Sequence, residues 1–597
     1  MKLTDYIANF LALNDVTTVF GFTGGAVVHF FDSIEKHPEL DIVFCHHEQA
    51  ASFAAPAYSK MKRNIGVCIT STGPGSTNAV TGVLGAWQDS IPCIFISGQS
   101  RLEHSSRDKN VRQIGAQEFD IISLVKPITK YAVMVTDPKN IRYHLEKAMY
   151  LAKEGRPGPV WVDIPLNFQW MDIEVEALKS FPSEKERVSP GVSESDLSKF
   201  ESLFNKASRP LILVGNGIRL GHAEDELITL LDTWNIPFVS SWAACDIIHT
   251  AHPLYCGRIG MAGQRGGNLA VQNCDLLIAI GSHLSIPLTG TRTDYFSRES
   301  KRVMVDIDDN ELLSETVRID LKINANADDF LSKAIAIDSN KSLIEPWINK
   351  CQLYNSYNKC SNTKYIENFI DQYHFMGSVN KFFQSNDTIV VDGGGTVVYS
   401  TFQTLKIAKG QRVICSSSIG AMGSGLAESI GVCKANNGNN VILFVGDGSM
   451  QLNIQELQTI KHHNFPIKIF IINNGGYLSI RQTQREFLEG KFIGAAEDGG
   501  MSLPNYNKIS VAYGLDYKRI DNHNSLEEDI KNVLEIDGPM VCEVMINPKQ
   551  EIIPSQGFVK NPDGTGFPRP LEDMYPYLDR DEFKSLMIVK PLDVSND

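Results

Sequence analysis

The chain is 597 residues long and has 56 lysines and arginines against 70 aspartates and glutamates, a formal net charge of −14. This acidic balance argues against a nucleic-acid-binding surface. No apolar run approaches the roughly 18 residues of a membrane span, and the N-terminal MKLTDYIANF lacks the basic-then-apolar pattern of a signal peptide. We therefore expect a cytoplasmic globular protein without membrane or nucleic-acid partners, and the length predicts three or four domains. The 11 cysteines lack a CxxC pair, which favours small buried residues over disulfides or a zinc site.

Residues 1–183 alternate helical and strand-like segments, the pattern of a doubly wound parallel α/β sheet. A first expected strand leads into a glycine-rich turn within 19–25, and a second ends at 45–48. Two more strands are expected at 67–70 and 91–99, and a second glycine-rich turn follows the first of these over 71–78. Glu48 stands at a strand end beside alanine-rich helical sequence with few polar partners. Its position alone favours a solvated glutamate at a helix N-terminus. The alternative is a buried carboxylate with a specific hydrogen-bonding partner.

The middle of the chain repeats the α/β pattern. A polar stretch over 184–194 indicates a linker, and residues 190–338 contain strand-like runs at 211–217, 275–281 and 302–308. Acidic residues at the ends of such strands are of the kind that hold a ribose hydroxyl in nucleotide-binding domains. Residues 339–365 follow as an expected helix and connector.

The last α/β pattern, over residues 366–550, contains a strand-helix-strand unit with polar strand ends. The strand 441–445 leads into Gly446-Asp447-Gly448, a helix is expected over 452–463, and the strand 467–472 ends on Asn473-Asn474. Ligands of such sheets bind at the carboxyl ends of the strands. Asp447, the side-chain oxygen of Asn474 and the main-chain carbonyl of Gly476 are hard oxygen ligands of the kind Mg²⁺ takes, and a diphosphate commonly completes its shell. An ordinary tight turn is the alternative interpretation of a lone GDG.

The GDG turn, its spacing to the NN pair and the segment His47-Glu48-Gln49-Ala50-Ala51 resemble the signature of thiamine-diphosphate (ThDP) enzymes of the acetolactate synthase large-subunit family. Further matches in the family's order occur at 72–78, 98–99, 117–118 and 155–165, so the resemblance covers residues 1 to about 550. It implies three doubly wound domains: pyrimidine-binding at 1–183, central nucleotide-binding-like at 190–338, and diphosphate-binding at 366–550. A C-terminal tail at 551–597 either covers the active site or forms a plain surface extension.

The resemblance also assigns roles to individual residues. In the family, the glutamate matched by Glu48 hydrogen-bonds the cofactor's aminopyrimidine, the positions of Gln117 and Gly25 face the reacting centre, and the methionine matched by Met422 props the cofactor into a bent shape. Gly446 and Gly448 would let the backbone approach the diphosphate. The expected ThDP-binding residues are Thr72, Asn78, Gly446, Gly448, Ser449 and Gly476. The expected Mg²⁺ ligands are Asp447, Asn474 and Gly476.

A flavin and an oligomer are further implications of the resemblance. In the acetolactate synthase branch the central domain binds FAD, which takes no net redox part, whereas many other ThDP enzymes leave this domain empty or fill it with ADP. We expect FAD, and the matching positions are Arg156, Gly215, Gly217, Gly260, Gly263 and Asp306. In this fold family the two sides of a site come from different subunits. A homodimer with interfacial sites is therefore the smallest expected unit, and a homotetramer is common.

Three departures from acetolactate synthases concern the acceptor side. Leu166 follows Asp163-Ile-Pro165 where the family has a lysine, residues 284–290 replace an FDDRVTG run, and Thr483 stands near the position of a specificity-setting tryptophan. These changes predict a larger or more polar acceptor than a second pyruvate. Residues 474–484 and 572–583 also resemble ThDP enzymes of bacterial surface-polysaccharide pathways. Among these is the flavin-containing carboligase of yersiniose synthesis, which transfers an acetyl unit from pyruvate to a nucleotide-bound ketosugar.

The expected enzyme is therefore a ThDP- and Mg²⁺-dependent transferase. It decarboxylates pyruvate or a similar 2-keto acid and transfers the acyl carbanion to a carbonyl acceptor, expected to be a nucleotide-linked ketosugar of polysaccharide synthesis. Arg481 is a candidate contact for an acceptor phosphate, with a surface salt bridge as the alternative. The other possibilities are an acetolactate synthase with pyruvate as acceptor, a 2-keto acid decarboxylase or oxidase, and a silent regulatory subunit. Intact Glu48, Asp447 and Asn474 argue against the silent subunit.

Overall fold

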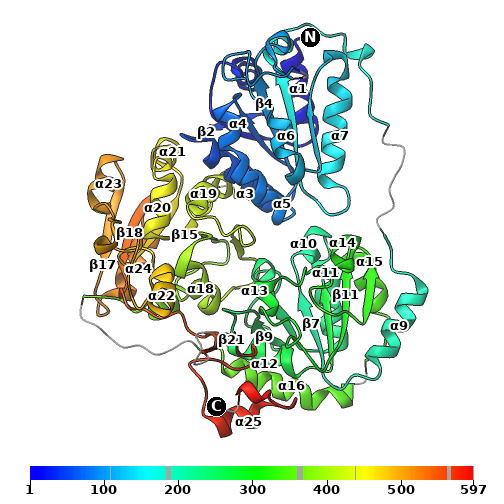
Figure 1. The fold of residues 1–597 in the computed structure, drawn as a ribbon, viewed down its shortest axis with the longest axis vertical. Helices are drawn as coiled ribbons and strands as arrows, with labels where there is room; N and C mark the ends of the chain where they lie inside the picture. Colours follow the sequence, from blue (N-terminus) through cyan, green and yellow to red (C-terminus); the bar gives the residue numbers. More distant parts are fainter. Residues whose placement is uncertain are drawn as a thin grey trace. The chain divides into compact units, whose positions relative to one another are not determined.

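The computed structural model describes residues 1–107, 109–182, 190–339, 341–359, 368–436, 438–560 and 566–595. The chain divides into two compact units. One comprises Met1–Glu186, Asn386–Val397 and Val413–Pro548, and the other comprises Arg187–Ser385, Val398–Arg412 and Lys549–Asp597. Within the described residues, the first unit holds two six-stranded parallel sheets and the second holds one (Figure 1). No helix in these ranges is long and apolar enough to cross a membrane.

The N-terminal sheet follows the apolar runs of the sequence. Its strand order is β2-β1-β3-β4-β6-β5, with β1 at Thr18–Gly21, β2 at Asp41–Phe44, β3 at Gly66–Thr70, β4 at Cys93–Gln99, β5 at Tyr131–Met134 and β6 at Pro159–Pro165. The accompanying helices include α1 (Leu3–Leu13), α2 (Val28–Glu35), α3 (Glu48–Lys62), α5 (Val80–Gln88) and α7 (Ile141–Lys153). Strands β3, β4 and β6 are buried along their whole length, as in doubly wound sheets whose two faces are covered by helices. Cys45, Cys68 and Cys93 are buried here, as expected.

The C-terminal sheet repeats this topology. Its order is β14-β13-β15-β16-β18-β17, with β13 at Thr388–Val391, β14 at Arg412–Ile414, β15 at Val441–Gly446, β16 at Ile467–Asn473, β17 at Asp516–Ile520 and β18 at Met540–Met545. Numbered within each domain, the two orders are the same. The helices include α18 (Gly395–Thr404), α19 (Ser424–Ala435), α22 (Leu478–Phe487), α23 (Tyr506–Ala512) and α24 (Leu526–Glu535). The helix expected over 452–463 is instead divided into α20 (Asp447–Met450), a 3₁₀ turn at Gln451–Asn453 and α21 (Glu456–His463). The amide of Asn453 donates to the carbonyl of Gly423, a tertiary bond at the end of that 3₁₀ turn.

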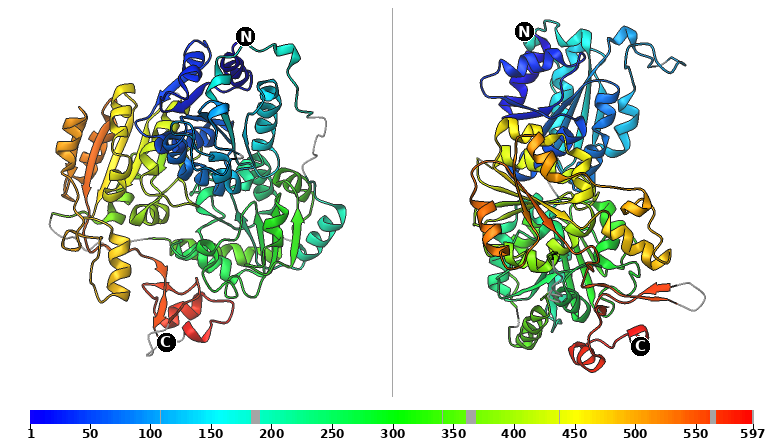
Figure 2. Two further views of the ribbon diagram at one scale, coloured as in Figure 1. Left: turned by 45° about the horizontal axis from the view of Figure 1, so that its top comes forward. Right: turned by 90° about the vertical axis from the view of Figure 1, so that its left-hand side faces the viewer.

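Helices α3 and α19 join the two domains of the first unit and lie side by side (Figures 1 and 2). Both are rich in small residues, so their backbones approach closely: a Cβ on Gly431 would lie 2.0 Å from the carbonyl oxygen of Ala54. Lys60 crosses the junction, with its Nζ 2.9 Å from both Asp89 Oδ2 and the carbonyl oxygen of Cys415. A single hydrophobic cluster contains residues of both domains. The N-terminal and C-terminal domains therefore share one core.

The central sheet has a different order, β12-β11-β10-β7-β8-β9. Its strands are β7 (Pro210–Val214), β8 (Phe238–Ser240), β9 (Tyr255–Arg258), β10 (Leu276–Ile280), β11 (Lys301–Asp306) and β12 (Leu321–Asn324). Numbered within the domain, this order is that of dinucleotide-binding sheets, whose ligand crevice lies where the strand order reverses, beside β7 and β10. Helices α9 (Glu194–Phe204), α11 (Glu224–Trp234), α12 (Arg265–Asn273), α15 (Ala327–Ala334) and α16 (Lys341–Ser356) belong to the same domain. Parts of the expected linker and connector, at 183–189, 340 and 360–367, lie outside the described residues.

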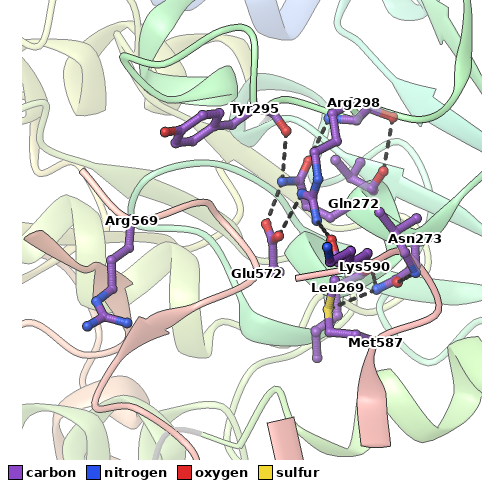
Figure 3. Close-up of polar contacts among 12 residues, drawn as sticks. Leu269, Gln272, Asn273, Tyr295, Arg298, Arg569, Glu572, Met587 and Lys590 are labelled. Atoms are coloured by element: carbon purple, nitrogen blue, oxygen red, sulfur yellow. Dashed lines mark hydrogen bonds and ion pairs between the residues drawn. The ribbon is translucent and has the colours of Figure 1, made fainter. Parts of the chain in front are cut away.

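The C-terminal tail packs on the central domain through buried charged groups. Figure 3 shows Glu572, which is fully buried, in an ion pair with Arg298 at 2.7 Å and accepting a bond from the Gln272 amide. After helix α25 (Arg580–Leu586), the backbone N–H groups of residues 588 and 589 donate to Asn273 Oδ1. Short strand pairs complete the tail, β19 (Ser555–Gln556) with β22 (Met574–Tyr575) and β20 (Phe558–Lys560) with β21 (Gly566–Pro568). The tail is an integral part of this unit and not a plain surface extension.

Candidate active site

Asp447 stands at the carboxyl end of β15 as the first residue of α20, and its side chain is buried. Its Oδ1 accepts the N–H of Gly448 at 2.7 Å. Its Oδ2 accepts the N–H groups of Asn474 at 3.0 Å and Gly476 at 2.9 Å. Burial raises the pKa of Asp447 to about 6, and these N–H groups oppose the rise. One carboxylate therefore ties the turn after β15 to the turn after β16.

Asn474 lies at the same edge of the sheet, and its side-chain oxygen accepts no hydrogen bond from the described residues. Its Nδ2 donates to Thr396 Oγ1 at 3.2 Å, whereas its Oδ1 is buried and has no hydrogen-bond partner among the residues that the structure describes. Such an oxygen beside a carboxylate suits a hard cation such as Mg²⁺. The Gly476 carbonyl accepts the Leu478 N–H at 3.1 Å and keeps a second lone pair. The three expected oxygen donors thus lie on one pair of adjoining turns.

A metal here would depend on one carboxylate. In the described ranges there is no group of three or more His, Cys, Asp or Glu side chains that could hold an ion. A site built from Asp447, an amide oxygen and a main-chain oxygen leaves coordination positions for phosphate oxygens, as Mg²⁺ sites commonly do. Gly446 fits this arrangement, because a Cβ at that position would meet no atom closer than 3.7 Å. Gly448 is different, since its Cβ would lie 2.2 Å from the Tyr477 ring, so packing explains that glycine.

Arg481 braces the turn that carries the expected metal donors. Its side chain is 6% exposed, and its guanidinium donates to the carbonyl oxygens of Gly475 at 2.7 Å and Asn474 at 2.8 Å. Burial lowers its pKa, and the charge of Asp447 opposes this effect. The interpretation of Arg481 as a surface salt bridge is therefore wrong, and the acceptor contact stays a prediction.

Met422 lies in the turn before α19, and a buried carboxylate holds this turn in place. Asp392, at the end of β13, accepts the N–H groups of Gly423 at 3.1 Å and Gly425 at 3.0 Å. Met422 and Ser449 lie together, because a Cβ on Gly394 would be 2.5 Å from Met422 Cγ and 2.9 Å from Ser449 Oγ. Sequence reasoning identified Met422 and Ser449 but missed Asp392. The available signal was an acid at a strand end followed by three glycines.

Glu48 begins α3 and is 9% exposed. Its Oε2 accepts the Nδ2 of Asn78, on the short helix α4 (Pro74–Asn78), at 3.0 Å. The interpretation as a solvated helix-terminal glutamate is therefore wrong, and the carboxylate has the specific buried partner that its position requires. A neutral amide orients the carboxylate without neutralising its charge.

Thr72 and Gln117 meet at the same edge of the N-terminal sheet, after β3 and β4. Gln117 has a left-handed φ of +57°, and its carbonyl oxygen accepts the Thr72 hydroxyl at 3.2 Å. Gly25 follows β1, and a Cβ there would meet nothing within 4 Å. The structure therefore brings Thr72 and Gln117 into contact and leaves open space at Gly25.

Asn453 links the N-terminal and C-terminal domains within the chain. Its Nδ2 donates to the carbonyl of Gly423 at 2.8 Å and lies 3.4 Å from Gln49 Oε1. Gln49 follows Glu48, and Gly423 follows Met422, so the start of α3 and the Met422 turn face each other across one side chain. Glu456 adds a second link by accepting the His46 N–H at 3.0 Å. Sequence reasoning missed both linking residues, whose partners lie 404 and 410 residues away along the chain.

Gly215 and Gly217, two of the residues matched to FAD binding, follow β7 and pack on the loop after β10. The Gly217 N–H donates to the Gly281 carbonyl at 2.8 Å, and a Cβ on Gly215 would lie 2.1 Å from the same oxygen. Close packing of two loops accounts for these glycines whether or not a flavin is bound.

The other four FAD-matched residues are spread over both units. Gly260 and Gly263 stand in the turn after β9, and Asp306 ends β11, where its Oδ1 accepts the Asp308 N–H at 2.9 Å. Arg156 belongs to the N-terminal domain, where its Nε donates to Ser90 Oγ at 2.8 Å.

Comparison with known families matches each of the three α/β domains. Residues 1–124 match the thiamine pyrophosphate enzyme N-terminal TPP binding domain, residues 197–334 the central domain, and residues 393–544 the C-terminal TPP binding domain. The expected residues for the pyrimidine side and for the diphosphate side fall within, or directly beside, the first and third of these matches.

Curated relatives match along nearly the entire chain. An acetolactate synthase large subunit of Porphyra purpurea is 30% identical over 564 residues, which cover 90% of this chain and 91% of the relative. That of Cyanidium caldarium is 29% identical over 560 residues, covering 92% and 94%. The isozyme 1 large subunit of Escherichia coli K12 is 28% identical over 550 residues, covering 92% and 95%. The chain therefore belongs to the acetolactate synthase large-subunit family of ThDP enzymes and is a ThDP-dependent carboligase of that type.

Proposed function

We propose that the enzyme joins pyruvate, or a close 2-keto acid, to a carbonyl acceptor that carries a phosphate group, such as a nucleotide-linked ketosugar of polysaccharide synthesis. When bound, ThDP supplies the carbanion-stabilising chemistry that decarboxylation and carbon–carbon bond formation require. The observation that carries the acceptor class is a cationic pocket beside the loop of Gln117.

The residues of the chain are proposed to divide the remaining tasks. Asp447, Asn474 and the Gly476 carbonyl hold Mg²⁺ and through it the diphosphate, which the open Asn474 oxygen supports. The Glu48 carboxylate, oriented by Asn78, holds and returns a proton at the aminopyrimidine. Met422 would contact the cofactor from a turn that Asp392 holds in place.

The cationic pocket has a volume of about 360 Å³ and is lined by Leu102, Glu103, Ser105, Arg107, Lys109 and Thr136. Arg107 and Lys109 are exposed, and within the ranges that the structure describes neither side chain forms an ion pair. Among the described lining residues Glu103 is an acid, and it lies 3.9 Å from Arg101. Two exposed cations and two hydroxyl groups in one concavity match the oxygens of a phosphate or diphosphate.

A buried acid anchors this pocket to the active-site loop. Glu118, 6% exposed, accepts the N–H of Ser106 at 3.0 Å, the hydroxyl of Ser106 at 2.8 Å and the N–H of Ile114 at 3.3 Å. Because Glu118 directly follows Gln117, the same carboxylate holds the cation-bearing loop and the residue expected to face the reacting centre. A phosphate bound at Arg107 would therefore lie next to Ser106, which Glu118 holds beside Gln117.

The position expected to limit acceptor size also lacks an aromatic wall. Thr483 is exposed on α22, and its hydroxyl is bonded to the Ser479 carbonyl of the same helix at 3.2 Å. Leu166 begins the short helix α8 (Leu166–Gln169) in place of a charged residue. A small residue and an uncharged residue at these positions support an acceptor larger than pyruvate.

Proton NMR of the holoenzyme with pyruvate, with and without a nucleotide-linked 4-ketosugar, tests this proposal. We expect little product from pyruvate alone and an acetyl-branched sugar when the ketosugar is present. The double variant Arg107→Ala/Lys109→Ala should raise the KM of the nucleotide-linked acceptor about tenfold or more and leave pyruvate consumption without acceptor unchanged. Lys139→Ala, which removes an exposed lysine elsewhere in the domain, is the matched control.

The rival activities give different results in the same experiment. Efficient acetolactate formation from pyruvate alone would overturn the ketosugar proposal in favour of an acetolactate synthase. Aldehyde release without an acceptor would indicate a decarboxylase, and oxygen consumption with pyruvate would indicate an oxidase.

We also propose that the central domain binds FAD. The dinucleotide-type strand order supports this, since β7 and β10 adjoin at the point where such sheets bind ligands. Asp306 at the end of the neighbouring strand β11 is placed as a ribose-binding acid would be. The visible flavin absorbance of the purified protein, and chromatography of the cofactor released on denaturation, test the proposal. Release of ADP, or of no nucleotide, would refute it.

The smallest active unit is proposed to be a homodimer, with a homotetramer as a common higher form. The support is the family's use of pyrimidine and diphosphate domains from different subunits. Sedimentation velocity of the holoenzyme tests this, and full activity of a monomer would contradict it.

A further inference from the structure

Asp163 is a buried carboxylate at the carboxyl edge of the N-terminal sheet. It lies on β6 in register with Ser97 on β4, and it is 1% exposed. Its Oδ1 accepts the Ser97 hydroxyl at 2.6 Å, and its Oδ2 accepts the Gln99 Nε2 at 3.0 Å. Ser97 in turn accepts the indole N–H of Trp161 at 2.8 Å. Among the described residues, the donors to the Asp163 carboxylate are thus all neutral.

The carboxylate determines how the Gln99 amide is turned, because an ionised carboxylate only accepts hydrogen bonds. The NH₂ group of Gln99 must point at Asp163, and its second hydrogen goes to the Phe119 carbonyl at 2.9 Å. Its Oε1 then accepts the Thr72 hydroxyl at 2.8 Å and the Ser100 N–H at 3.0 Å. Reversing the amide would place its NH₂ group against the Ser100 N–H, donor against donor. The orientation of Gln99 is therefore set by its neighbours.

Thr72 and Gln117 depend on that orientation. The hydroxyl proton of Thr72 points to Gln99 Oε1 and to the Gln117 carbonyl, 3.2 Å away, which leaves a lone pair for the open side. Gln117 has a left-handed φ, which residues with side chains rarely adopt, so its turn needs bonds from outside. The adjoining Gly73 confirms how close the two turns lie, because a Cβ there would be 2.4 Å from the Gln117 carbonyl oxygen.

We propose that Asp163 is a positioning residue of the active site: acting through Gln99, its carboxylate aims the Thr72 hydroxyl and holds the left-handed turn at Gln117. The proposal rests on the proposed roles of Thr72 and Gln117 in the ThDP site. It does not depend on which acceptor the enzyme uses.

The positioning requires the ionised form of Asp163. Burial raises its pKa to about 7; the hydrogen bonds from Ser97 and Gln99 oppose the rise, and the charges of Asp120 and Glu118 add to it. Protonation would set an O–H against the Gln99 NH₂ or reverse the Ser97 hydroxyl, and either change weakens the link to Thr72. Because the carboxylate exists above a pH of about 7, the rate of pyruvate consumption should fall as the pH drops through that value.

The test is the pH profile of kcat for pyruvate consumption by holoenzyme variants. Asp163→Asn keeps the shape of the side chain and should lower kcat about tenfold at alkaline pH. It should also remove the acid limb of the profile, which is the fall of kcat as the pH drops through about 7. Ser97→Ala removes a hydrogen bond to the carboxylate and should move the limb to higher pH. Asp120→Asn removes a nearby negative charge and should move it to lower pH. The two shifts keep the proposal testable even where Asp163→Asn does not fold.

Two further measurements separate positioning from general structural damage. Adding Asp163→Asn to the Gln99→Met variant should change kcat by less than about twofold. Asp163 acts through Gln99, so the effects of the two substitutions should not add. In the protein without cofactor, the fluorescence of Trp161 should titrate near pH 7, and Trp161→Phe identifies that signal among the 6 tryptophans of the chain. An acid limb that persists unchanged in Asp163→Asn, or additive losses in the double variant, would overturn the proposal. Because the readout is the consumption of pyruvate without acceptor, however slow, a wrong acceptor assignment leaves the result intact.

Discussion

Replacing Asp163 by asparagine should stabilise the N-terminal domain at alkaline pH even though it slows the enzyme. An aspartate titrates near 3.8 in an unfolded chain, whereas burial raises the pKa of Asp163 to about 7 in the folded protein. The folded state therefore binds this proton more tightly than the unfolded state, and free energy of unfolding is lost as the pH rises from about 4 to about 7. A pKa difference of about three units corresponds to about 4 kcal/mol, an upper limit for the cost of burying the charge.

The assay is the thermal unfolding midpoint of cofactor-free wild type and Asp163→Asn at about pH 5 and about pH 8. At the lower pH somewhat more than half of the charge-burial cost is absent, so the difference between the two proteins should be smaller than at the higher pH. At the higher pH the variant should unfold several degrees above the wild type, since roughly 2–4 °C accompany each kcal/mol in domains of this size. Glu176→Gln, on an exposed residue of the same domain, is the control. An advantage of the variant that shrinks as the pH rises would refute the argument.

Four other changes test separate parts of the structure. Asp447→Asn should weaken Mg²⁺-dependent ThDP binding at least about tenfold in a fluorescence titration, because it removes the carboxylate of the proposed metal site. Arg481→Met should weaken Mg²⁺ binding by about tenfold while leaving the acceptor KM unchanged, since the guanidinium binds the metal turn. Gly431→Val should push α3 away from α19, cost about 3 kcal/mol of the free energy of unfolding and lower the thermal midpoint. Gly377→Ala is the control and should leave the midpoint unchanged, because Gly377 has open space around it. Arg298→Met should cost about 3–5 kcal/mol and expose the tail to proteolysis by leaving Glu572 unpaired, and a second change, Glu572→Met, should restore much of the loss.

The strands and their polar ends were predictable from the sequence because buried parallel strands are unbroken apolar runs. Strands β15 and β16 begin at Val441 and Ile467, as expected, and they deliver Asp447 and Asn474 to one edge. The spacing of these two residues carried the cofactor prediction, and the family comparison confirms it. Glu48 was identified through its resemblance only, since its position alone favoured a solvated side chain.

The roles of other residues could not be predicted from the sequence, because their partners lie far away along the chain or are main-chain groups. The charge of Arg481 suggested the surface, and nothing in its local sequence shows that two carbonyl oxygens of the metal turn would enclose its guanidinium. Asp163 belongs to the Asp163-Ile-Pro165 motif of the sequence, yet its proposed positioning role depends on the pairing of β4 with β6 and on the amide of Gln99. The tail posed the same difficulty, since Glu572 meets a cation 274 residues away.

Asp447, Asp392 and Asp163 share one way of holding an active-site loop. Each is a buried acid at a strand end whose carboxylate accepts N–H or O–H groups and, in the described residues, forms no ion pair. A carboxylate has several lone pairs, so one side chain can tie two turns together. A lysine or arginine partner would add bulk and a positive charge that competes with a bound cation, whereas backbone N–H groups and neutral side chains do not. Burial raises the pKa of all three acids, which is the energetic cost of this arrangement. The carboxyl edges of both sheets therefore depend on buried charges that support the loops at the expense of some stability.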